Sequence, residues 1–289
     1  MTNAWYRIAL ADQGGIRLAV APGAHLGEAL ATAVARVGRG REVWPVAAAL
    51  ATAGEVPLGE SVGKGVVVER GAAVGVHDFR YPSGVLAALD EQGRSGLVTA
   101  GVHLSQRDTT AVLEAVAPGG QARESFLDVI ERLSTVDNVE VRLADHYDGA
   151  GHDEIWLTPR LRDLRRALRF LDDFDVDLLD SGHVDVAIYV REPRSTWRLT
   201  QHKTLVLLTD DPALRPKVIG WLAAAGLAEV ERPAPVGAIP HLHYRPAASS
   251  DRARLRARLK KVGLRAVATV KDGVSTPVAA PVGKGARSS

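Results

Sequence analysis

Residues 184–208 read VDVAIYVREPRSTWRLTQHKTLVLL and decide the fold class. The run holds two stretches rich in β-branched and aromatic residues, which favour strands. Glu192-Pro193-Arg194 lies between them and is a turn signal. The pattern therefore predicts a strand over Asp185–Arg191, a turn, and a second strand over Trp197–Leu208.

The segments that follow alternate helix and strand. Apolar spacing predicts helices over Pro212–Ala225 and Asp251–Val262, and strands over His241–Tyr244 and Arg265–Val270. Each helix has a capping residue before it and a glycine after it, as helix termini need. The order strand, strand, helix, strand, helix, strand predicts a ferredoxin-like layer, an antiparallel or mixed sheet with helices on one face.

The amino-terminal half has its own pattern. Trp5–Ala11 and Ile16–Val20 flank a turn-rich break and predict an opening hairpin, and a helical apolar stripe begins at Leu26. Pro118-Gly119-Gly120 then interrupts the pattern. We therefore expect an α+β fold with two subdomains, residues 1–120 and residues 121–270. Residues 271–289 carry Gly, Ser, Thr, Pro and Lys without periodicity, which predicts a disordered tail.

Shorter segments are assigned from local spacing. Ser83–Leu89 and Thr109–Val116 are predicted to be helices, with a strand over Leu97–His103 between them. In Asp173–Asp177 every second residue is an aspartate, which favours a half-buried strand with an acidic outer face. Leu178 stands where a calcium loop requires glycine, so calcium is not expected there.

Composition excludes several classes of site. The 289 residues include no cysteine, which excludes disulfides, thiol nucleophiles and iron–sulfur clusters. Lys+Arg 36 against Asp+Glu 34 gives a net charge of +2, and nearly all of the positive charge is arginine. No apolar run is long enough to cross a bilayer, and the amino end lacks the features of a signal peptide. We expect a cytoplasmic protein without a bound cofactor and without membrane contact.

Two tripeptides of the form H-x-[S/T] fall on predicted strands, HLS at residues 103–105 and HKT at residues 202–204. Residues i and i+2 of a strand face the same way, so each imidazole would share a surface with a hydroxyl. The pair resembles the paired tetrapeptide of the 2H phosphoesterases, although Gln106 stands where that family prefers an apolar residue. The resemblance implies a metal-independent phosphoesterase acting on RNA ends or a cyclic nucleotide. Its acid/base pair would be His103 and His202, with Ser105 and Thr204 as phosphate donors.

Two other groups contain ligands that suit a divalent metal ion. His146, His152 and Asp153 lie near further carboxylates around a glycine-rich turn, where a solvated surface loop is the simpler explanation. His241 and His243 share one face of a predicted strand, but no third ligand is evident for them. The sequence therefore assigns no metal site.

Arginines line the outer faces of two predicted helices, opposite their apolar stripes. Such faces suit a negatively charged partner. Exposed aromatic residues, which many nucleic-acid-binding surfaces interleave with basic ones, are scarce, so a protein partner is favoured over nucleic acid. The residues are Arg162, Arg166 and Arg169 on the helix from Pro159, and Arg252, Arg256 and Lys260 on the last helix.

For each candidate catalytic motif, an ordinary structural role for the same residues is the better supported explanation. The sequence therefore favours a non-enzymatic binding or regulatory protein, such as a bacterial accessory or immunity-like protein. The metal-independent phosphoesterase is the alternative, so the sequence leaves catalysis undecided. The partner and the oligomeric state are left open.

Overall fold

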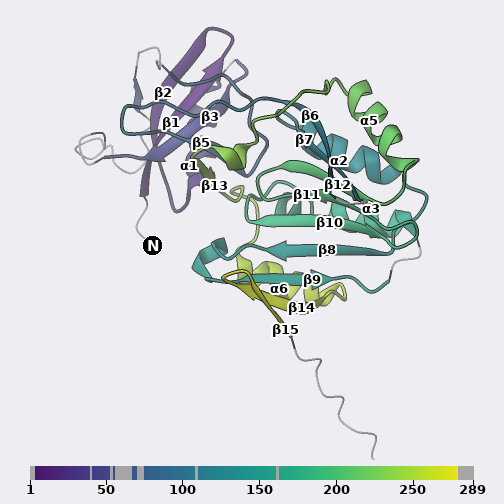
Figure 1. Cartoon of the computed structure of the whole chain (residues 1–289). Helices are drawn as coiled ribbons and strands as arrows, with labels where there is room; N and C mark the ends of the chain where they lie inside the picture. The colour runs from purple at the N-terminus through teal and green to yellow at the C-terminus, as the bar shows by residue number, and fades with distance from the viewer. Residues whose placement is uncertain are drawn as a thin grey trace, which may run out of the picture.

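The structure, a computed structural model, describes residues 4–39, 41–52, 55, 67–69, 75–107, 110–160 and 163–278. Its helices and two β-sheets give the α+β fold that the sequence predicts (Figure 1). Within these residues, no helix is both long enough and apolar enough to cross a membrane.

The first sheet has six strands in the order β13-β5-β3-β1-β2-β4. β1 and β2 form the predicted opening hairpin, and helix α1 packs on the sheet through buried residues such as Ala29 and Leu30. The elements are β1 (Ala4–Asp12), β2 (Gly15–Gly23), α1 (Leu26–Val37), β3 (Trp44–Leu50), β4 (Val67–Glu69), β5 (Val85–Ala88) and β13 (His241–His243).

The second sheet has nine strands in the order β15-β14-β9-β8-β10-β11-β12-β7-β6. The strands are β6 (Gly101–Arg107), β7 (Thr110–Val116), β8 (Asn138–Leu143), β9 (Asp153–Leu157), β10 (Val184–Val190), β11 (Ser195–Leu199), β12 (Thr204–Thr209), β14 (Arg265–Lys271) and β15 (Val274–Pro277). The accompanying helices are α2 (Gln121–Glu131), α3 (Leu164–Asp173), α4 (Asp175–Leu178), α5 (Leu214–Ala224) and α6 (Arg252–Lys261), with short 3-10 turns η2 (Tyr147–Gly149) and η3 (Val236–Ala238).

Helices α2, α3, α5 and α6 bury their apolar residues in one core with the inward residues of this sheet. Trp197 of β11 lies in that core, and its indole N–H donates to the carbonyl of Phe126 at 3.0 Å. The alternate residues of β8 and β11, including Arg142 and Arg198, are only partly buried. One face of the sheet is therefore apolar and covered, and the other is polar.

The predicted boundary at residue 120 does not coincide with the division between the sheets. β6 and β7 precede that residue, yet they form one edge of the nine-stranded sheet. β13 comes late in the chain and pairs with β5 of the six-stranded sheet, with His241 opposite Ala87. Strand pairing depends on contacts distant in sequence, which local turn signals such as Pro118-Gly119-Gly120 do not encode. A ferredoxin-like arrangement of the carboxyl half stays a prediction.

Four local predictions are corrected. Residues 85–88 and 110–116 are strands, although helices were expected, and the aspartate-rich segment Asp175–Leu178 is helical. The predicted strand Trp197–Leu208 is interrupted by a turn at residues 200–203. Short apolar runs suit either structure, and here pairing with neighbouring strands decides between them.

The predicted tail does not begin at residue 271. Asp272 and Gly273 have φ values of 50° and 78°, which join β14 and β15 in a tight hairpin that continues to Pro277. Asp-Gly is a strong hairpin signal because both positions of such a turn require positive φ. Residues 279–289 lie outside the described residues.

Candidate metal centre

Five of the nine histidines gather where the two sheets meet. His241 and His243 belong to β13 of the six-stranded sheet. The other three lie beside strands of the nine-stranded sheet. His146 follows β8, His183 precedes β10, and His202 precedes β12. The ring centroids of His146 and His243 lie 4.5 Å apart, and those of His202 and His241 lie 4.8 Å apart.

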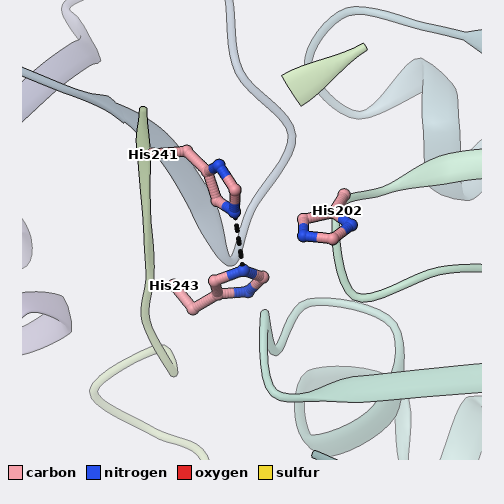
Figure 2. Close-up of side chains that lie close together, drawn as sticks. All are labelled: His202, His241 and His243. Carbon is pink, nitrogen blue, oxygen red and sulfur yellow. Dashed lines mark hydrogen bonds between the residues drawn. The ribbon is translucent and has the colours of Figure 1, made fainter. Parts of the chain in front are cut away.

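Three of these histidines form a set with metal-ligand geometry. One ring nitrogen from each of His202, His241 and His243 lies within 4.8 Å of the others, and all three residues are half-buried. Figure 2 shows the two β13 rings on one side and the His202 ring facing them from the other sheet. Residues i and i+2 of β13 point the same way, as the sequence predicts.

Backbone carbonyls fix the tautomers of the β13 pair. The Nδ1 of His241 lies 2.7 Å from the carbonyl oxygen of Ile239, and the Nδ1 of His243 contacts the carbonyl oxygen of Gly182. A carbonyl oxygen only accepts, so each Nδ1 carries a proton and donates it. In the neutral rings the lone pair is then on Nε2. The two Nε2 atoms lie only 3.0 Å apart (Figure 2).

Two lone pairs at this distance repel each other unless a cation lies between them. A proton on His243 is disfavoured, because burial, together with the neighbouring His146, lowers its pKa to about 3. A metal ion that accepts both lone pairs would remove the repulsion at neutral pH. Donation from the other ring nitrogen to a carbonyl is also the usual way in which a metal-bound histidine is oriented.

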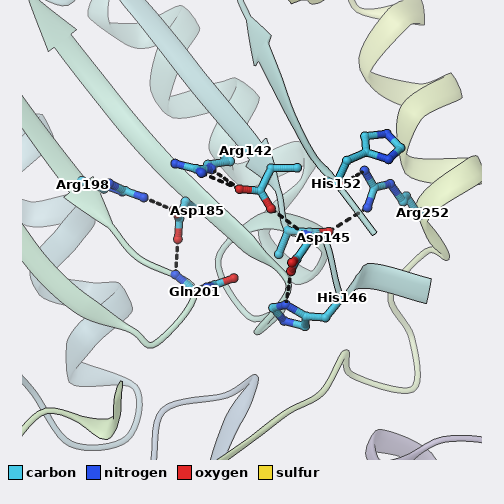
Figure 3. A network of polar contacts seen from close by, with 10 residues as sticks. Arg142, Asp145, His146, His152, Asp185, Arg198, Gln201 and Arg252 are labelled. Atoms are coloured by element: carbon cyan, nitrogen blue, oxygen red, sulfur yellow. Dashed lines mark hydrogen bonds and ion pairs between the residues drawn. The ribbon is translucent and has the colours of Figure 1, made fainter. Parts of the chain in front are cut away.

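The third imidazole is positioned by the turn between β11 and β12. Asp185 accepts hydrogen bonds from the Arg198 guanidinium and from the backbone N–H of Gln201, which holds the start of the turn (Figure 3). Lys203 has a φ of 59°, a left-handed conformation uncommon for residues other than glycine. Burial lowers the pKa of His202, so its neutral, ligating form is favoured.

Gly237 packs directly against the His202 ring. A Cβ atom at this position would lie 3.2 Å from Nδ1 and 3.3 Å from Cγ of that ring. The backbone of η3 can approach so closely only because residue 237 has no side chain.

A histidine–aspartate pair adjoins the three-histidine set. The Nδ1 of His146 lies 3.1 Å from Oδ1 of Asp145, and this hydrogen bond lowers the pKa of the carboxyl group (Figure 3). His183 stacks on Tyr147 at a centroid distance of 4.9 Å. Burial lowers the pKa of His183 to about 3, and its Nδ1 has no hydrogen-bond partner in the described part of the chain.

The structure does not bring His103 next to His202. His103 pairs with Glu114 on β7, and Glu114 pairs with Val206 on β12, so His103 is two strand spacings, about 10 Å, from β12. His202 precedes β12, and its ring neighbours are His241 and His243. His103 and Ser105 instead line a cavity of about 850 Å³, and Thr204 is the first residue of β12.

The sequence offered three loop residues, His146, His152 and Asp153, as candidates for metal ligands without assigning a site. Of these, only His146 lies in the histidine group. His152 lies with its Nδ1 3.0 Å from the carbonyl oxygen of Ala150. Asp153 forms an ion pair with Arg142 and accepts from the backbone N–H of Asp145 at 2.6 Å. These two residues therefore organise the loop after β8.

The arginine faces are only partly as expected. Arg252 was predicted to face outward, but its side chain is 7% exposed, pairs with Glu154 and donates to the carbonyl of Ala144 at 2.7 Å. Apolar spacing did not reveal this, because an arginine at the start of a helix can reach back into neighbouring loops. On the same helix, Arg256 pairs with Glu154 and Lys260 lies over the Trp156 ring. On the other predicted face, Arg166 and Arg169 are exposed, as expected. Arg162 lies outside the described residues.

No family model, curated protein or solved structure matches this chain. The chemistry of the site is therefore inferred from its own side chains. The sequence indicates the shared face of His241 and His243 but does not indicate that His202 joins them.

Proposed function

We propose that the protein holds a Zn²⁺ ion between His202, His241 and His243 and uses it to hydrolyse a substrate. The 3.0 Å approach of the two Nε2 atoms, whose Nδ1 atoms both face carbonyl oxygens, carries this proposal. Zinc prefers tetrahedral sites and binds imidazole nitrogen well. Copper and nickel also accept imidazole, so the metal must be identified by measurement.

Three protein ligands favour a catalytic over a structural role. Structural zinc sites are closed by four protein ligands, whereas catalytic sites keep one position for water. Zinc lowers the pKa of that water to about 7 and so supplies a nucleophile at neutral pH. His146, hydrogen-bonded to Asp145 and with its ring 4.5 Å from that of His243, is suitably placed to transfer a proton.

A second candidate function keeps the metal but not the catalysis. The ligands come from both sheets, so an ion bound there would fix the relative placement of those sheets. This arrangement favours a non-enzymatic binding or regulatory protein whose protein partner recognises the metal-loaded form. The metal-independent phosphoesterase is less well supported, because His103 lies away from His202.

Metal binding is tested first, on protein purified without a histidine tag. We expect one zinc ion per chain by elemental analysis, and a loss of affinity of at least about 100-fold in His241→Ala by calorimetry. His152→Ala is the matched control, because it removes a nearby histidine outside the set. Wild-type protein that binds neither zinc, copper nor nickel, or equal affinity in His241→Ala, would refute the proposed site.

Hydrolysis separates the two candidate functions. Zinc-loaded protein is assayed with p-nitrophenyl acetate and bis(p-nitrophenyl) phosphate, and we expect turnover that His241→Ala abolishes. His146→Gln is expected to retain zinc but to lower kcat by about 100-fold. Stoichiometric zinc without turnover would favour the binding protein over the hydrolase.

A further inference from the structure

A second cavity, of about 600 Å³, adjoins the backbone that carries the metal ligands. Lys203 follows His202 and Tyr244 follows His243, and both line this cavity. Successive residues of an extended chain point to opposite sides. The Tyr244 side chain therefore points away from the ring of His243, and none of the three metal ligands lines the cavity.

Lys203 is a buried cation on the wall of this cavity. Its side chain is among the most buried polar groups, at 2% exposed, and its Nζ donates to the carbonyl oxygen of Ser181 at 2.6 Å. An ammonium group has three N–H donors. Among the residues that the structure describes, Lys203 forms no ion pair. The carboxylates of Asp180 and Asp185 act on it from further away, and Asp180 lines the same cavity. The Ser181 carbonyl takes one of the three N–H donors, so the ammonium group can also donate to a ligand in the cavity.

Other donors line the same cavity. Arg80 packs against Gly119, where an added Cβ would lie 3.2 Å from the arginine Cδ, and its ion pair with Glu42 is exposed. Helix α2 begins at Gln121 after Gly120, and no side chain caps it. Arg123 also lines the cavity and pairs with Asp175 and Asp180.

The cavity also has aromatic walls. Trp44, Tyr81 and Tyr244 line it, together with Leu127 and Leu199. Tyr81 is 7% exposed, and its hydroxyl is a buried polar atom without a hydrogen-bond partner in the described residues. Two carboxylates, Asp180 and Glu124, face three cationic side chains. The lining thus combines three cationic side chains with flat apolar surfaces.

We infer that this cavity binds a small organic phosphate with a flat ring, a nucleotide-like ligand. Its phosphate would pair with Lys203 and Arg80 and accept from backbone N–H groups in the first turn of α2. The ring would lie against the aromatic walls. The volume matches that of small-molecule sites and greatly exceeds that of a phosphate alone. This inference does not depend on the metal centre.

The test uses full-length His241→Ala protein treated with a chelator, so that phosphate cannot bind through zinc. AMP, inorganic phosphate and adenosine are titrated by calorimetry. We expect AMP to bind with an affinity that falls as salt rises, inorganic phosphate to compete with it, and adenosine to bind at least about tenfold more weakly. Equal binding of adenosine and AMP, or no binding of AMP, would overturn the inference.

Variants locate the site. Arg80→Ala is expected to weaken AMP binding about tenfold. Lys203→Met is expected to abolish it, because it removes the buried ammonium group, and the Tm of the ligand-free variant is measured to show that it still folds. Arg94→Ala, which breaks an exposed ion pair with Asp90, is the control and should bind AMP normally. Unchanged AMP binding in both cavity variants would refute the site. Zinc binding by wild-type protein is measured separately, so failure of the AMP site and failure of the metal site can be told apart.

Discussion

His241 and His243 face each other across 3.0 Å through their Nε2 atoms, while both Nδ1 atoms are bonded to backbone carbonyls. The backbone therefore fixes the ring orientations and the tautomers before any ion arrives. Such preorganisation reduces the reorganisation that metal binding requires. It also has consequences that can be measured without knowing the substrate.

Zinc binding should resist mild acid. Burial is the main cause that lowers the pKa values of His202 and His243, so both rings lose their protons at a lower pH than exposed histidines do. We expect the zinc affinity to fall less than about tenfold between pH 7.5 and pH 6, whereas three ordinary histidines would lose about fiftyfold. Calorimetry across this range measures the change. A fiftyfold loss would show that the rings titrate like exposed histidines.

Gly237→Ala should weaken the metal site without unfolding the protein. The new Cβ would lie 3.2 Å from the His202 ring and displace it, and we expect about a tenfold loss of zinc affinity. Gly220→Ala is the control, because a Cβ there meets no atom within 4 Å. Since residue 220 lies inside α5, that variant should gain about 0.5–1 kcal/mol of stability. Unaltered zinc affinity in Gly237→Ala would argue against His202 as a ligand.

Arg252→Ala should destabilise the fold. The guanidinium is buried, pairs with Glu154 at 3.3 Å and donates to the carbonyls of Ala144 and His152. Arg252→Ala leaves the buried carbonyls without this donor, although Glu154 keeps its ion pair with Arg256, and we expect a loss of about 1–3 kcal/mol in urea unfolding. Arg169→Ala, at an exposed position, should change stability by less than about 0.5 kcal/mol. Similar small effects for both would contradict a structural role for Arg252.

Metal-free protein should lose stability on acidification below pH 6.5. Burial lowers the pKa of His183 to about 3, whereas in the unfolded chain it has the ordinary value of about 6.5. The unfolded state therefore binds the proton first, and stability falls from pH 6.5 towards pH 3 by up to about 1.4 kcal/mol per pH unit. His183→Gln should reduce this slope between pH 6 and pH 5 in urea unfolding, while His243, whose pKa burial also lowers to about 3, keeps its own contribution. The exposed His77→Gln control should keep the wild-type slope.

Helices with clear amphipathic spacing and cap signals were predictable from sequence. The opening hairpin, α1, α5 and α6 occur close to where local patterns place them. Residues 85–88 and 110–116 were not predictable, because short apolar runs fit a helix as well as a strand. The position of β13 was not predictable either, since its partner β5 lies far away in the sequence.

The sequence indicated two of the three histidines of the candidate site as a pair. The spacing of His241 and His243 indicates one shared face, and the structure confirms it. His202 was expected within a long strand beside Thr204, but a left-handed Lys203 turns the chain there and presents the imidazole to the other sheet. Nothing in residues 200–203 signals that conformation, because lysine rarely adopts it.

The late position of β13 in the chain orders events during synthesis. Five strands of the first sheet are made early, but the strand that pairs with β5 emerges only after most of the second sheet has been translated. Contacts this distant in sequence form slowly, because a long loop must close first. Completion of that sheet and the arrival of His241 and His243 beside His202 are therefore a single late step. Most of the chain has therefore been synthesised before the three histidines of the proposed metal site can come together.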